Sequence, residues 1–592
     1  MKNIIFKTAL TALAVVSLSS CNDYLERTPL DSNSDATNWT SEAALETFSW
    51  KFYGYLSELS YGSGWTRGQY HSETLTDDYA PESFEMFTKN IPASSSKWST
   101  PYDRIREANI LLNRVDRVPN LSEAAANHWR GIARFFRALY HFQLVKTYGD
   151  VVWVEDEIDF SKEENVTKAR DSRVTVMKNV VADLQFAVAN CYSPSEAPEN
   201  TVNSMVANAL LSRVALYEGT WEKYHNTPGG DANTFLTVSK NASAAIMSSG
   251  LYEVTNNYKG MYTSLSLSGS KEVLMYKIYS LANVNGGKVS MAHSQYGWID
   301  SSTPTWGLTR SAMESYAMSD GLPFYQSPTY SDQTMAGIFS NRDARLTATV
   351  YDQIIPIVES AWDYGIVSTT GFWTFKFLDL SKRAEYEANN TWNAPSNDTD
   401  GPIFQYSEVL ENYAEACAEL GSLTQADLDK TVNLLRQKHG NIPALTYSGA
   451  NSVSVNGRPV LDDLFDASPS IILQEIRRDR RVELMADGFR HDDLMRWALG
   501  KQLDTKLNPR GYTGVSKAVA IAYATSAGMN ESKVLSENFW ADGYKSPYNT
   551  AAVNATGTTV DRVWNDKYYL EPIPSGQTLL DPNLGQNDGW TE

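Results

Sequence analysis

Residues 470–502 have the sequence SIILQEIRRDRRVELMADGFRHDDLMRWALGKQ, the densest charge pattern in the chain. Glu475, Asp479, Glu483 and Asp487 follow at steps of four, which predicts four carboxylates on one stripe of a continuous helix. Arginines lie between them, at positions 477, 478, 480 and 481. Pairs at i,i+3, such as Glu475 with Arg478, contribute only a few tenths of a kcal/mol. Local pairing therefore does not explain the pattern.

Two interpretations of these carboxylates compete. A catalytic acid that keeps its proton at neutral pH needs an apolar pocket, or a like charge without a cation beside it. The neighbouring arginines instead predict lowered carboxylate pKa values. We therefore predict a structural network of ion pairs that fixes this helix against other segments. We call these four carboxylates and their cationic partners the clamp.

The N-terminus has the pattern of a secreted lipoprotein. Residues 1–20 form a predicted signal peptide, in which Lys2 and Lys7 provide a basic start and residues 8–18 an apolar run too short to span a membrane. The sequence LSSC ending at Cys21 has lipobox spacing, so we predict that Cys21 is lipidated and that residues 21–38 form a tether. The alternative is an ordinary signal peptide that happens to precede a cysteine.

Charge and hydropathy restrict the partners. The formal net charge is −19, which argues against nucleic acid and anionic headgroups and makes neutral ligands the easier match. No later apolar run approaches 18 residues, so membrane attachment is predicted through the lipid only.

Hydrophobic periodicity predicts a mainly α protein. Residues 39–230 contain amphipathic helices in antiparallel pairs that suggest a tetratricopeptide-like helical repeat. Residues 231–400 are rich in Gly, Ser, Asn and aromatics, which predicts mostly irregular structure with short β-like pieces such as 272–279. Helices resume in residues 401–592, at 405–420 and 423–439, before a Gly- and Tyr-rich tail.

Several motifs, in this order, resemble the SusD/RagB family of nutrient-binding surface lipoproteins. They are CNDYLERTPLD from Cys21, FFRALYHFQLVKTYGDV at 135–151, YSEVLENYAEACAELG at 406–421, the arginine-rich stretch at 470–502 and YYLEPIPSGQTLLDPNLGQNDGW at 568–590. Departures are modest: Asp479 and Asp487 replace the more usual Glu, and Val152 replaces a proline. The resemblance implies a tetratricopeptide-like scaffold, an outer-membrane location, no catalytic residues and a SusC-like TonB-dependent transporter as partner.

The chemistry that remains for a ligand is aromatic surface in loops. Sugar rings stack on Trp and Tyr, while Asp and Arg at the rim hydrogen-bond their hydroxyls. The predicted ligand contacts are Trp65, Arg67, Tyr70, Asp77 and Asp78 in a first loop, and Tyr296, Trp298, Trp306, Trp362 and Trp373 in a second region. Trp129, Trp153 and Trp497 are assigned to the core instead.

The sequence offers little for cofactor chemistry. The histidines are scattered, so no cofactor and no metal are predicted. Residues 396–401, SNDTDG, match only the start of a calcium loop.

The leading functional hypothesis is a surface protein that captures an oligosaccharide or polysaccharide for the transporter without catalysis. Three alternatives stay open: a peptide-binding member of the same family, a secreted glycoside hydrolase and a helical scaffold without a small ligand.

Overall fold

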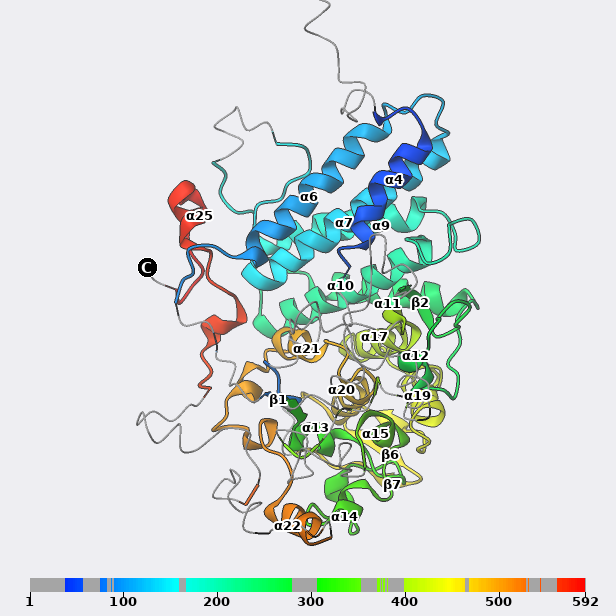
Figure 1. Cartoon of the computed structure of the whole chain (residues 1–592), viewed down its shortest axis with the longest axis vertical. Helices are drawn as coiled ribbons and strands as arrows, with labels where there is room; N and C mark the ends of the chain where they lie inside the picture. Colours follow the sequence, from blue (N-terminus) through cyan, green and yellow to red (C-terminus); the bar gives the residue numbers. More distant parts are fainter. Residues whose placement is uncertain are drawn as a thin grey trace, which may run out of the picture.

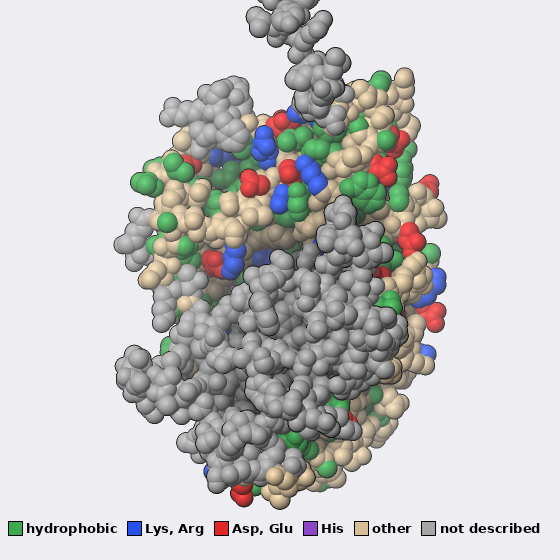
Figure 2. Space-filling model, viewed as in Figure 1, with side chains coloured by type: hydrophobic (Ala, Val, Ile, Leu, Met, Phe, Trp, Pro, Cys, Tyr) green, Lys and Arg blue, Asp and Glu red, His purple; other side chains and the backbone are tan. Residues whose placement is uncertain are grey.

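The computed structural model describes residues 38–56, 75–81, 87, 90–158, 167–278, 306–352, 370–372, 374, 376–377, 379, 381, 399–463, 468–526, 528, 531, 543–544 and 562–590. Long helices fill one half of the molecule, and short helices and ribbons fill the other (Figure 1). Figure 2 shows Lys and Arg side chains close to Asp and Glu side chains over the helical half.

The helical half is a stack in which each helix packs on the next. The order of packing follows the chain from α6 to α7, α9, α10 and α11, and then to α17 and α20. The bounds are α4 (Glu42–Tyr53), α6 (Ser96–Val115), α7 (Glu123–Tyr148), α9 (Arg173–Asn190), α10 (Ser204–His225), α11 (Ala232–Ser248), α17 (Tyr406–Glu419), α20 (Ile471–Glu483) and α21 (Arg490–Arg496). The prediction of a mainly α, tetratricopeptide-like fold is confirmed.

Local sequence explains where these helices begin. Ser122 caps α7 by accepting a hydrogen bond from the backbone N–H of Ala125. Ser172 and Asn203 cap α9 and α10 in the same way. Helix α10 is the centre of the stack, and Gly219 lets α11 approach closely, because a Cβ there would lie 2.8 Å from the Leu236 side chain.

The other half is built on a second hydrophobic core, which includes Tyr79, Leu308, Phe372 and Val482. Its short helices, with those of the tail, are α12 (Gly260–Thr263), α13 (Arg310–Ser315), α14 (Met335–Phe339), α15 (Ala344–Thr349), α18 (Gln425–Asp429), α19 (Val432–Lys438), α22 (Lys517–Ser526) and α25 (Ser575–Leu580). Single turns of 3₁₀ helix are η3 (Phe324–Gln326), η5 (Gly500–Leu503), η6 (Pro509–Gly511), η7 (Asp566–Tyr569) and η8 (Pro582–Leu584).

The described strands form three small antiparallel ribbons. β1 (Tyr79–Pro81) pairs with β3 (Trp306–Leu308), and β2 (Val273–Lys277) pairs with β4 (Gly401–Gln405). The third ribbon joins β5 (Thr446–Gly449), β6 (Ser452–Val455) and β7 (Arg458–Pro459). β2 lies within the segment 272–279, so that prediction is confirmed.

Three predictions about helices are wrong. Residues 470–502 do not form one helix, because α20 ends at Glu483 and the chain turns through Ala486 and Gly488, whose φ angles are 69° and 86°. The predicted helix at 423–439 is divided into α18 and α19. Finally, α11 is a long helix where irregular structure was expected.

Candidate functional site

Three segments that carry predicted ligand residues are bordered by residues that meet at one place. In the β1–β3 ribbon, Tyr79 lies opposite Leu308, and the Leu308 N–H donates to the Phe372 carbonyl at 3.3 Å. We call residues 77–81, 306–309 and 370–372 the loop base. These residues follow segments 57–74, 279–305 and 353–369 in the chain.

Side-chain hydrogen bonds fix the loop base. The Thr309 hydroxyl donates to the Asp77 carbonyl at 2.5 Å and also caps α13 by accepting from Ala312. The Thr370 hydroxyl donates to the Leu308 carbonyl at 2.6 Å. These bonds join three distant parts of the chain, so the points where the three segments emerge are held in a defined arrangement.

Asp77 and Asp78 attach the loop base to α20 and α21. The Arg490 guanidinium donates to both carboxylate oxygens of Asp77, at 2.7 and 2.9 Å. The Nε of Arg481, on α20, donates to Asp78 at 2.7 Å. Both carboxylates are buried and face arginines of the chain. Their predicted contact with a ligand stays a prediction.

Burial and charge have opposite effects at this pair. Burial alone would raise the pKa of Asp77, but the charges of Arg481 and Arg490 outweigh it and hold that pKa well below its usual range. Burial raises the pKa of Asp78 despite Arg481, with a contribution from the Asp77 charge. The bidentate geometry of the Asp77–Arg490 pair also fixes the orientation of this attachment.

Of the predicted ligand residues, the structure describes the side chains of Asp77 and Asp78. Trp306 begins β3, but its side chain lies outside the described part of the chain. The remaining positions lie outside the described residues; they are Cys21, Trp65, Arg67, Tyr70, Tyr296, Trp298, Trp362 and Trp373. Trp129 and Trp497 are buried, as predicted for core residues, and Trp153 is half-buried.

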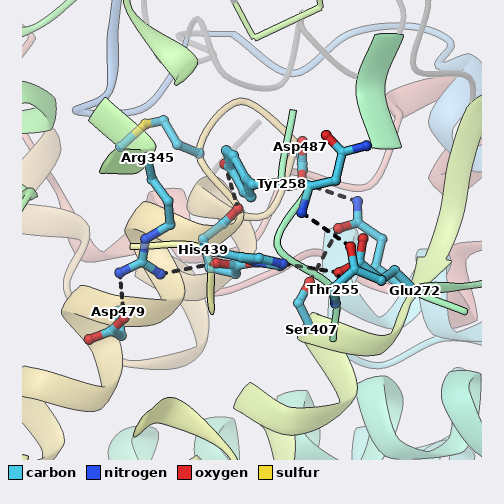
Figure 3. A network of polar contacts seen from close by, with 12 residues as sticks. Thr255, Tyr258, Glu272, Arg345, Ser407, His439, Asp479 and Asp487 are labelled. Atoms are coloured by element: carbon cyan, nitrogen blue, oxygen red, sulfur yellow. Dashed lines mark hydrogen bonds and ion pairs between the residues drawn. The ribbon is translucent and has the colours of Figure 1, made fainter. Parts of the chain in front are cut away.

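The clamp is present, and it joins α20 to α15 and to His439 at the C-cap of α19 (Figure 3). The Arg345 guanidinium, on α15, donates to Asp479 at 2.8 Å and to Glu483 at 3.0 Å. His439 contacts the other Glu483 oxygen through Nδ1 at 2.8 Å. Asp487, in the turn after α20, accepts from Lys376 at 2.9 Å. The prediction of a structural network that fixes α20 against other segments is thus confirmed.

The pKa values within the clamp differ from the prediction in part. Burial would raise the pKa of Glu483, but His439 and Arg345 lower it to about 2. The same interaction overcomes burial at His439 and raises its pKa to about 9. At Glu475 and Asp487 burial outweighs the neighbouring cations and raises the pKa, so the prediction of lowered values is wrong there.

Sequence patterns do not single out the main cationic partners. Arg345, Lys376 and His439 lie 138, 111 and 44 residues from the carboxylates that they contact. The available signal is the row of carboxylates itself, which requires cations from elsewhere once it is buried. Such a requirement does not identify which cations supply the charge.

Glu411 is an exception among the buried carboxylates of this region. It lies on α17, is fully buried, and neither carboxylate oxygen has a hydrogen-bond partner among the residues that the structure describes. Burial, with the charges of Asp479 and Glu483, raises its pKa well above the usual value. Folding therefore favours the protonated form of Glu411.

Together, the helical stack and the loop base define a class of protein: a helical-repeat scaffold in which the residues that follow three aromatic-rich segments meet at one place. This chain belongs to the SusD family, whose model matches residues 271–590. A second model, described as starch-binding associating with outer membrane, matches residues 23–216.

Relatives and solved structures agree with this assignment. A SusD-like protein of Bacteroides ovatus is 27% identical over 44% of this chain, and the match spans 47% of that relative. SusD-like protein P38 of Formosa agariphila is 23% identical, over 83% of this chain and 90% of its own.

Among solved structures, a SusD-like carbohydrate-binding protein from Bacteroides fragilis has a TM-score of 0.67 at 22% identity, covering 93% of this chain and 100% of its own. A laminarin-binding SusD-like protein has a TM-score of 0.53 at 16% identity, with the same coverage.

In the part of the chain that the structure describes, no helix combines the length and apolar character needed to cross a bilayer.

Proposed function

We propose that this protein is a lipid-anchored protein of the outer-membrane surface that binds an oligosaccharide or polysaccharide. It delivers this ligand to a SusC-like TonB-dependent transporter and breaks no bond. The observation that carries the proposal is the loop base, where the borders of segments 57–74, 279–305 and 353–369 meet.

The composition of these segments suits a glycan. They carry Trp65, Tyr70, Trp298 and Trp362, whose rings offer flat faces for the apolar C–H surfaces of sugars. A rigid base fixes the spacing at which such rings emerge, which lowers the entropy lost when an extended ligand binds. The proposal assigns recognition to these segments and stability to the clamp.

The comparisons support the same role. The names of two solved relatives refer to carbohydrate binding and to laminarin binding. The family model at residues 23–216 refers to the outer membrane, and Cys21 lies just before that match. Membership of the SusD family supports the proposed transporter partner and the proposed absence of catalysis.

A panel of polysaccharides and peptides, titrated calorimetrically into the purified mature protein, tests this function. We expect saturable heat with at least one glycan. Each reaction is then assayed for new reducing ends, which should stay at the level of a protein-free control. Sustained turnover would support the hydrolase alternative and overturn the proposal, and so would binding of peptides without binding of any glycan.

A further inference from the structure

A pocket rich in arginine lies directly beside the loop base. It is bounded by α20, α13, η6 and Arg490 at the start of α21, and Asp77 of the loop base is part of its wall. Its lining includes Arg477, Arg478, Arg481, Arg490 and Arg510, and we call it the arginine pocket. The cavity volume is about 70 Å³, which gives room for a few water-sized groups.

The carboxylates of the lining are already paired. Asp77 is held by Arg490, and Asp463 accepts from Arg478 at 2.9 Å. Glu314 accepts from Arg310 at 2.9 Å and also contacts Arg510. The lining therefore presents five guanidinium groups and three carboxylates, each of which has an arginine partner.

Two of these guanidinium groups keep a donor available. Arg481 uses Nε and Nη2 to contact Asp77, Asp78 and Ser311, and Arg490 uses Nε and Nη2 to contact Asp77. Among the described residues, Nη1 of Arg481 and Nη1 of Arg490 have no hydrogen-bond partner. Their side chains are 11% and 12% exposed, so solvent still reaches them.

Neighbouring polar and aromatic groups complete the wall. Ser311 and Ser315 of α13 add hydroxyl groups, and the rings of Phe324 and Trp497 add apolar surface. The Arg477 guanidinium lies over the Trp497 ring at 4.3 Å. Planar guanidinium groups recognise carboxylate and sulfate oxygens through paired N–H donors, at short range and in a defined orientation.

The pocket contrasts with the charge of the chain. A net charge of −19 disfavours an anion at long range, but screening restricts that effect to about 10 Å or less at physiological salt. Within the lining of the pocket, five arginines outnumber three carboxylates. Such a site selects an anionic group that is brought to it as part of a larger ligand.

We propose that the arginine pocket binds a carboxylate or sulfate group of the glycan, so that the ligand is an acidic polysaccharide. One acidic substituent of the bound glycan enters the pocket, beside Asp77 of the loop base. This inference rests on the proposed function and specifies its substrate class.

Matched oligosaccharides test the inference. Oligogalacturonate is compared with its neutral methyl ester, and a sulfated oligosaccharide with its desulfated form, by calorimetry at constant ionic strength. We expect at least one acidic form to bind at least tenfold tighter than its neutral counterpart, and the two arms distinguish carboxylate from sulfate. Equal affinities within both matched pairs would overturn the inference while glycan binding, and with it the proposed function, remained.

Variants locate the effect. Arg490→Lys keeps the charge and loses the paired donors, so it should lower the acidic preference at least fivefold. Arg458→Gln is the control, because Arg458 is exposed on β7 and contacts Asp320 away from the pocket. If Arg490→Lys does not fold, sodium sulfate is titrated calorimetrically into the unmodified protein at constant ionic strength; saturable heat is expected, and its absence contradicts the pocket. Saturable binding of sulfate without binding of any oligosaccharide would support the pocket and overturn the proposed function instead.

Discussion

At the scale of single residues, Glu483 tests the clamp. It is fully buried between Arg345 and His439. In Glu483→Gln, His439 loses its nearer carboxylate and Arg345 loses one of its three, the others being Asp343 and Asp479. Breaking a buried pair in this way costs about 3–5 kcal/mol. Urea unfolding at pH 6 should show this loss, while glycan preference stays unchanged. Glu253→Gln, at an exposed position, should leave stability unchanged, and an unaltered Tm in Glu483→Gln would contradict the clamp.

His439 gives the clamp a predictable pH dependence. Its folded pKa of about 9 lies above the ordinary value of 6.5, so its stabilisation is complete below pH 6.5 and is lost as pH rises through 9. At ~1.4 kcal/mol per pH unit, the loss is roughly 3 kcal/mol. Glu483, with a folded pKa of about 2, loses its stabilisation as pH falls below 4.5.

Unfolding free energies measured from pH 6 to 10 check this expectation. Stability should fall over that range in the unmodified protein and remain flatter in His439→Gln. Parallel curves for the two proteins would show that His439 does not carry the effect.

Glu411 and Glu415, on the same helix, should respond oppositely. Folding raises the pKa of Glu411, so ionisation of this group favours the unfolded state. Glu411→Gln removes the ionisation and should therefore raise the unfolding free energy at pH 7. Glu415→Gln breaks a buried pair with Arg496 at 2.7 Å and should lower it. A loss of stability in Glu411→Gln would contradict this expectation and would show that the Glu411 carboxylate stabilises the folded protein.

At the scale of elements, the loop base depends on a close approach at Gly514. A Cβ at this position would lie 1.9 Å from the Thr370 carbonyl oxygen, and the next residue, Val515, donates to that same oxygen at 2.9 Å. Gly514→Ala must displace Thr370, where segment 353–369 ends. We expect a loss of glycan affinity of about tenfold, which is 1.4 kcal/mol.

Gly54→Ala, at the C-cap of α4, is the matched control, because a Cβ there meets Lys51 O at 3.3 Å and α4 packs on α6 and α7. Calorimetric titration of both variants with the glycan found in the panel checks the prediction. Unchanged affinity in Gly514→Ala would separate the loop base from binding.

Helices were predictable where their signals are local. Apolar periodicity and the Ser122 cap identify α7 because both depend on residues within one or two turns. Helix α11 was not predicted, because its sequence is rich in Ser, Thr and Asn, a composition typical of loops. In the structure Ser239 and Ser243 bond to Ser212 on α10, at 2.9 and 2.6 Å, so their hydroxyls are satisfied inside the helix pair.

The candidate site was predictable only as composition. Sequence identifies aromatic-rich segments, and it places Asp77 and Asp78 in the first of them. It does not show that these carboxylates meet Arg490 and Arg481, which lie 413 and 403 residues away. The turn at Ala486 was also hidden, since a positive φ at an alanine is imposed by tertiary contacts rather than by preference.

At the scale of the whole molecule, stability and recognition are joined at α20. One face of this helix contacts Arg345 and His439, and Arg481 holds the loop base through Asp78. The clamp carboxylates therefore position the loop base from outside the proposed ligand surface, while Arg478, the partner of Glu475, also lines the arginine pocket. This division explains why changes in the clamp should affect Tm and changes in the aromatic segments should affect affinity.

The most direct measurement is the glycan affinity of Trp65→Ala and Trp298→Ala, titrated calorimetrically with the glycan identified in the panel. Trp50→Ala serves as the control, because Trp50 is 47% exposed on α4. We predict that each loop variant keeps its Tm and loses about tenfold or more in affinity, as for central aromatic contacts, while the control binds normally. Unchanged affinity in both loop variants would contradict the account.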